Sequence, residues 1–173
     1  RISIRAATDM HGNVPLPARE SRLNLRDVDM QGLPHEYLVT ASADAEGTVT
    51  VGCEGLDDIQ SSPPAQFGGP GTQWSPEDLL VAAVADCLVL TFRAIARASR
   101  LESNTIECTA TGTLDRVERQ MRFTRMDIVA TVTVPVGTDL ARAERLLEKS
   151  EQTCLITNTL NCERHLQAIV RES

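Results

Sequence analysis

The sequence predicts an α+β fold in which strands cluster around one long, buried helix. Residues 79–90 are apolar on nearly every side of a helix, which is typical of a helix enclosed by protein. Residues 105–117 and 123–134 alternate in polarity and are rich in Thr and β-branched residues, which is typical of paired strands. The predicted order is β-β-α-β-β-α-(α)-β. Because the strands are clustered, this order indicates α+β with antiparallel sheets and not a parallel α/β fold.

The first two strands are predicted to form a hairpin. Residues 37–41 and 48–51 are the strands, and residues 44–47 supply a turn in which Gly47 can adopt positive φ. Residues 61–72 are rich in Pro and Gly and are expected to form a loop.

The long helix has a well-marked start. Ser75 is a favourable N-cap, Pro76 suits the first helical position, and Glu77 and Asp78 complement the positive end of the helix dipole. The pattern predicts an end near residues 99–101, which gives about 25 residues and roughly 38 Å of helix. One domain of this size can hardly surround such a helix, so we expect a second subunit to help bury it.

The second half of the chain continues with a strand pair linked by residues 118–120. A second helix is predicted from Asp139 to about Thr153, with Thr138 as its cap. Residues 154–160 are expected to form a short helix or turn, and residues 165–170 a last strand.

Composition excludes several classes of function. Of 173 residues 42% are apolar, and the net charge of −7 is spread along the chain, which argues against nucleic-acid or membrane-surface partners. No run approaches the roughly 20 apolar residues of a membrane span. The five cysteines show no CxxC pair and no metal-ligand spacing, so we expect no metal or cofactor and a reducing compartment, the cytoplasm.

Residues 1–32 differ in character from residues 33–173, which form the predicted main domain. The first segment has two prolines, many charges and little periodic hydrophobicity. It could be an ordered arm that covers a neighbouring molecule, or an extension with no functional role.

Two cysteines are the candidate reactive groups. Cys87 lies deep in the apolar helix, and Cys154 opens the short segment after the second helix. Each could be an inert core thiol, or the two could form a redox pair. Burial among Ala, Val and Leu would raise the pKa of Cys87, so a reactive thiolate would need a cation beside it. Cys53, Cys108 and Cys162 are interpreted as packing residues, with Cys162 as a possible competing thiol.

The segment from Gly69 to Cys87 resembles the OsmC/Ohr family of osmotically induced and organic-hydroperoxide-resistance proteins. The matching elements are the Gly-rich loop, the Ser-Pro-Glu-Asp-Leu-Leu helix start at 75–80, and Ala-Asp-Cys-Leu at 85–88. A second match is Cys154 after a helix. The order of elements agrees with that family from about residue 36 to residue 172.

The resemblance implies an intertwined homodimer with two long central helices. It also implies a thiol peroxidase that prefers organic hydroperoxides. Cys87 would attack the peroxide and become a sulfenic acid, Cys154 would resolve it as a disulfide, and a dithiol donor would reduce that disulfide. Glu77 matches the helix-start Glu that orients an activating Arg in the family.

The chain departs from the family at two positions. The family's activating Arg lies around the first hairpin, where residues 42–47 contain none. Leu155 also stands where members commonly have Pro. Substitutes for the Arg could come from five positions, which are Arg19, Arg22, Arg26, Arg122 and Arg125.

The missing hairpin Arg favours an alternative function. The chain would then be a non-peroxidatic OsmC-like protein that binds a small hydrophobic ligand at the dimer interface. A third possibility is a module whose N-terminal segment mediates docking.

Overall fold

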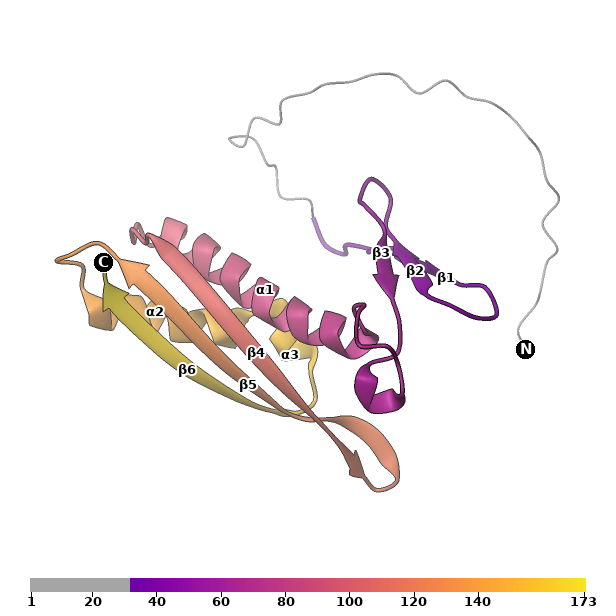
Figure 1. Ribbon diagram of the computed structural model, residues 1–173. Coiled ribbons are helices and arrows are strands. Elements are labelled where there is room, and N and C mark those ends of the chain that lie inside the picture. The colour runs from indigo at the N-terminus through magenta and orange to yellow at the C-terminus, as the bar shows by residue number, and fades with distance from the viewer. Residues whose placement is uncertain (1–31) are drawn as a thin grey trace, which may run out of the picture. The chain divides into compact units, whose positions relative to one another are not determined.

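The computed structural model describes residues 32–173, and a compact unit spans Leu38–Ser173 (Figure 1). The boundary predicted after residue 32 remains a prediction, and Arg19, Arg22 and Arg26 lie outside the described residues. The elements of the unit are β1 (Thr40–Ser42), β2 (Val49–Gly52), β3 (Ile59–Ser61), η1 (Ala65–Phe67), α1 (Pro76–Ala98), β4 (Thr105–Val117), β5 (Gln120–Val134), α2 (Leu140–Thr153), α3 (Leu155–Thr159) and β6 (Glu163–Glu172).

The first sheet is a small antiparallel one with the order β1-β2-β3. The predicted hairpin corresponds to β1 and β2, with β1 shifted toward Ser42. Strand β3 was not predicted, because three residues are too few to show an alternating pattern.

The second sheet has the order β4-β5-β6. Strands β4 and β5 form the predicted antiparallel pair, which runs from Thr105 opposite Thr133 to the turn at Glu118 and Arg119. These two turn residues have φ of 50° and 71°, the left-handed geometry of a tight hairpin. Strand β6 pairs with β5 in parallel, so the expectation of purely antiparallel sheets is wrong for this strand. A parallel neighbour requires a crossover, and α2 and α3 supply it.

The core lies on one face of this second sheet. Along β5 every second residue is buried (Met126, Ile128, Ala130, Val132 and Val134), while the intervening residues are half-buried or exposed. Helix α1 packs against β4, and α2 packs against β5, β6 and α1. Since only one face is buried, both helices cover that face, which Figure 1 shows.

Helix α1 begins as predicted. The Asp78 backbone N–H donates to Ser75 Oγ at 3.1 Å, and the Ser75 backbone N–H donates to Asp78 Oδ2 at 3.1 Å, which completes a capping box. The helix ends at Ala98 after 23 residues, close to the predicted end. Helix α2 differs in its cap, because Asp139 accepts from the Arg142 N–H at 2.9 Å and replaces the predicted Thr138.

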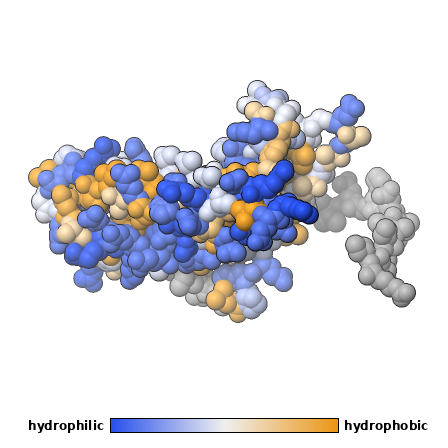
Figure 2. Space-filling view, turned by 90° about the horizontal axis from the view of Figure 1, so that it is seen from below, coloured by the Kyte–Doolittle hydropathy of each residue, from blue (hydrophilic) through white to orange (hydrophobic). Residues whose placement is uncertain are grey.

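A single chain buries α1 only in part, and its complete burial with the help of a second subunit remains a prediction. Its buried residues are confined to one stripe at i, i+4 spacing (Val84, Leu88, Phe92 and Ala96). Leu90 is 52% exposed, and apolar side chains reach the surface among polar ones (Figure 2). By length and composition α1 could also cross a membrane, contrary to the sequence expectation. A core helix passes the same test, and α1 packs against β4, α2 and α3.

Gly112 sets how closely α1 approaches the sheet. It lies on β4, and a Cβ atom there would stand 2.6 Å from Phe123 Cε1 and 2.9 Å from Val81 Cγ2. Both distances are shorter than van der Waals contact. The absence of a side chain at this position therefore lets the first half of α1 pack onto the strand pair.

We predict that Gly112→Ala lowers the free energy of unfolding by about 1–3 kcal/mol, because the added methyl would clash with Val81 of α1 and Phe123 of β5. Urea denaturation followed by circular dichroism measures this. Gly32→Ala is the matched control, since no heavy atom lies within 4 Å of its added Cβ. Equal stability of the two variants would contradict the close packing at Gly112.

Candidate active site

The two candidate thiols come together. Cys87 lies in the middle of α1 and is half-buried, and Cys154 is fully buried at the N-cap of α3. Helix α3 packs against α1, and each of the two thiols shifts the pKa of the other. No disulfide joins them in this structure. The packing of α3 on α1 therefore places a second thiol beside the first.

Cys87 has a lowered pKa although no cation stands beside it among the described residues. Burial raises the pKa, but four hydrogen-bond donors outweigh burial and leave the pKa below its ordinary value. In decreasing order of effect they are the Ile156 backbone N–H, the Cys154 thiol, the Thr91 hydroxyl and the Leu155 backbone N–H. The Thr91 hydroxyl lies 3.9 Å from the sulfur. Hydrogen bonds therefore offset burial at Cys87 without a cation among the described residues, and the need for a cation to form a reactive thiolate remains a prediction.

Cys154 behaves in the opposite way. Burial raises its pKa, and the neighbouring Cys87 raises it further, while Thr157 opposes the rise through its hydroxyl and its backbone. The Thr157 hydroxyl is buried and has no hydrogen-bond partner within the accepted distances among the described residues. The pair thus consists of Cys87 with a lowered pKa and Cys154 with a raised pKa.

The other cysteines do not take part in this pair. Cys108 on β4 and Cys162 pack against the core, as predicted. Burial raises the pKa of Cys108 to about 11, and Cys154 contributes to that rise. Cys53 is exposed, so its interpretation as a packing residue is wrong.

Glu77 is not brought next to Cys87 within one chain. The two residues are ten positions apart on α1, a separation of about 15 Å along the helix axis. Glu77 lines a cavity of about 380 Å³ at the start of the helix. Its Oε2 atom is buried and has no hydrogen-bond partner among the described residues. The cavity is lined by Pro64, Gln66, Phe67, Ser75, Glu77, Asp78, Leu114, Met121 and Phe123.

The described candidates for the activating Arg are placed elsewhere. Arg125 is bound by Asp127 through its Nε and Nη2 atoms at 2.7 and 2.6 Å. This pair holds the pKa of Asp127 below its usual range. Arg122 is exposed on the same strand. Neither residue is among the groups that shift the pKa of Cys87.

Sequence reasoning missed the groups that polarise Cys87. Thr91 could have been found, since it follows Cys87 by four residues and therefore shares its helix face. The backbone donors at 155 and 156 leave no signature in residue type. Leu155 stands where family members commonly have Pro. The residue before it, Cys154, has φ −64° and ψ 118°, an extended conformation that is also compatible with a following proline.

Comparisons with known proteins agree with this fold. A family model described as OsmC-like protein matches residues 69–167. The sequence is 26% identical over 113 residues to YmaD, an uncharacterized protein of Bacillus subtilis (strain 168), and the match covers 62% of this chain and 75% of that protein.

Solved structures share the architecture. An OsmC-like protein of unknown function from Vibrio cholerae has a TM-score of 0.72 at 19% identity, over 79% of this chain and all of that one. An organic hydroperoxide resistance protein from Elizabethkingia anophelis has a TM-score of 0.66 at 19% identity, over 83% and 100%. At such identities the likeness shows the fold, and the predicted α+β class is confirmed.

We predict that Cys87 is alkylated by iodoacetamide at least about tenfold faster than Cys108 at pH 8, since the lowered pKa of Cys87 gives it the larger thiolate fraction. Peptide mass spectrometry after timed alkylation from pH 6 to 10 reports each cysteine separately. In the urea-unfolded chain the midpoint for Cys87 should move to higher pH. A folded-state midpoint at or above the unfolded one would contradict the hydrogen-bonded thiolate.

Proposed function

Because the chain belongs to the family of OsmC-like proteins, we propose that it is a thiol-dependent peroxidase that reduces organic hydroperoxides. The observation that supports this most is the pairing of a Cys87 thiol of lowered pKa with a buried Cys154 of raised pKa. A two-cysteine peroxidase needs thiols of different pKa. The attacking sulfur must be a thiolate, whereas the resolving thiol reacts only after the sulfenic acid has formed.

The proposed cycle balances with one dithiol as reductant. The Cys87 thiolate attacks the distal oxygen of ROOH, so the O–O bond breaks and RO⁻ takes a proton to leave as ROH. Cys87 is then a sulfenic acid, Cys–SOH. The Cys154 sulfur attacks this sulfur, and water leaves as the Cys87–Cys154 disulfide forms. An external dithiol reduces the disulfide by exchange and becomes a disulfide itself.

The protein that carries out this cycle is proposed to be a homodimer assembled through α1. Apart from its one buried stripe, the helix keeps apolar residues that are half-buried or exposed, among them Leu80, Val89 and Leu90. A second copy is the partner that the proposal names, since its own α1 offers the same apolar surface.

Glu77 also fits a site completed by a second copy. A separation of about 15 Å along one helix is beyond the reach of a glutamate side chain. Any effect of Glu77 near Cys87 would therefore have to come from the partner subunit, and its unpaired Oε2 atom is free to accept a donor.

A second candidate function is the binding of a small hydrophobic ligand without peroxidase chemistry. The cavity beside Glu77 favours it, because Phe67 and Met121 line that cavity and are each 50% exposed. The lack of a cation beside Cys87 among residues 32–173 points the same way. Failure of cumene hydroperoxide to oxidise Cys87 in the wild-type protein would favour this candidate.

We predict that Cys87→Ser lowers turnover of cumene hydroperoxide, with a dithiol such as dihydrolipoamide as reductant, by roughly 10³-fold or more, because a serine hydroxyl stays protonated. Cys154→Ser should still consume one equivalent of peroxide and accumulate a sulfenic acid at Cys87 that dimedone traps. Exposed Cys53 supplies the control, as Cys53→Ser should turn over like wild type. Full activity in Cys87→Ser would refute the mechanism.

We predict that Leu90→Glu weakens dimerisation by at least about 100-fold in Kd, since burying an unpaired carboxylate costs several kcal/mol. Light scattering coupled to size exclusion over a dilution series measures this. Val136→Glu is the control, because Val136 is an exposed apolar residue outside α1. A monomeric wild type, or a Leu90→Glu dimer of unchanged affinity, would exclude assembly through this face.

A further inference from the structure

Helix α3 is too short to be stable by itself, although Ile156 packs against the core. It has five residues, Leu155–Thr159, and its N-cap makes no side-chain hydrogen bond. Helices this short are unstable in isolation, and the carbonyl groups of their last turn have no partner within the helix. Yet α3 packs against α1, and the backbone groups of Leu155 and Ile156 lower the pKa of Cys87. Something outside α3 must therefore fix its position.

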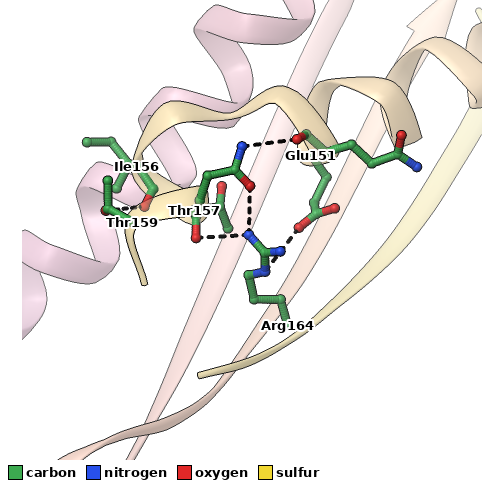
Figure 3. Close-up of polar contacts among 7 residues, drawn as sticks. Glu151, Ile156, Thr157, Thr159 and Arg164 are labelled. Atoms are coloured by element: carbon green, nitrogen blue, oxygen red, sulfur yellow. Dashed lines mark hydrogen bonds and ion pairs between the residues drawn. The ribbon is translucent and has the colours of Figure 1, made fainter. Parts of the chain in front are cut away.

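Arg164 makes the contacts that meet this need. It projects from β6 toward α3, and its Nη1 atom donates to the Thr157 carbonyl and to Asn158 Oδ1, both at 2.9 Å (Figure 3). Its Nε atom lies 3.7 Å from Glu151 Oε1 on α2. One guanidinium thus joins three elements, with α3 held from its C-terminal side, where a cation is favourable.

A second polar link runs through the same residues. Asn158 Nδ2 donates to the Gln152 carbonyl at 3.0 Å, so Asn158 bridges Arg164 and the end of α2. The side chains of Arg164 and Glu151 are 33% and 17% exposed, so water screens this cluster only in part. The cluster links the C-terminal half of α3 to α2 and β6.

We propose that Arg164 is a positioning residue that holds α3, and with it the backbone N–H groups of Leu155 and Ile156, against the Cys87 sulfur. The inference rests on Cys87 being the reactive thiol of the proposed function. Arg164 acts through the backbone of α3 and does not touch the sulfur. Among the described residues, the titratable Cys154 at the N-cap of α3 lies beside that sulfur, and Cys108 on β4 lies next to Cys154.

The test is the pH profile of Cys87 alkylation in the full chain, read by peptide mass spectrometry. Arg164→Gln should move the midpoint to higher pH and lower the rate at pH 7 roughly three- to tenfold, the effect of weakening about one net hydrogen bond to the thiolate. Asn158→Ala should do the same without a change of charge. Arg171→Gln is the matched control, since it removes the same charge from the same strand and its guanidinium contacts Thr133.

Three outcomes would overturn the inference. The first is a Cys87 profile in Arg164→Gln equal to that of Arg171→Gln. The second is an effect in Arg164→Gln but none in Asn158→Ala, which would indicate the charge of Arg164 and not its hold on α3. The third is faster alkylation of buried Cys108 and Cys154 together with Cys87, which would indicate general loosening. If Arg164→Gln does not fold, Asn158→Ala alone decides.

The readout is independent of peroxide turnover. A wild type that reduces no hydroperoxide, combined with slowed alkylation in Arg164→Gln and Asn158→Ala, would remove the proposed function and keep the positioning role. An active wild type with unchanged profiles in both variants would do the reverse.

Discussion

The contact between the middle of α1 and the start of α3 decides what this protein can do. Burial in the core would make Cys87 an inert thiol, as it does Cys108, whose pKa rises to about 11. At Cys87 the same penalty is overcome by hydrogen bonds, two of them from backbone N–H groups of α3. The contact exists because the chain leaves β5, crosses through α2 and α3, and returns as β6 parallel to β5. The topology of the sheet thus places the donors.

Much of the fold could be predicted from local patterns. The capping box at Ser75, the bounds of β4 and the alternating face of β5 all follow from periodicity and capping chemistry. The pairing of Cys87 with Cys154 came from the family resemblance, because no spacing rule joins two cysteines on separate helices.

What could not be predicted depends on tertiary contacts. The parallel pairing of β6 is a property of the crossover, and a strand's own residues do not encode its direction. Almost every residue carries a backbone N–H group. Only the fold therefore reveals that the N–H groups of residues 155 and 156 face a sulfur. Arg164 could not be singled out from the sequence, since its three partners lie on elements that only the fold brings together.

Two features of α1 in a single chain are both explained by a second copy of the chain packed along this helix. The first is apolar surface: α1 buries one stripe of residues, and other apolar side chains such as Leu90 stay exposed to water, so burying them would be favourable. A buried Glu77 oxygen without a partner among the described residues carries a desolvation cost that nothing offsets. A second copy packed along α1 would reduce the first deficit by covering the helix. It would also bring foreign side chains to the region of Glu77. Assembly and completion of the site would then be one event, so loss of the dimer should change the environment of both Glu77 and Cys87.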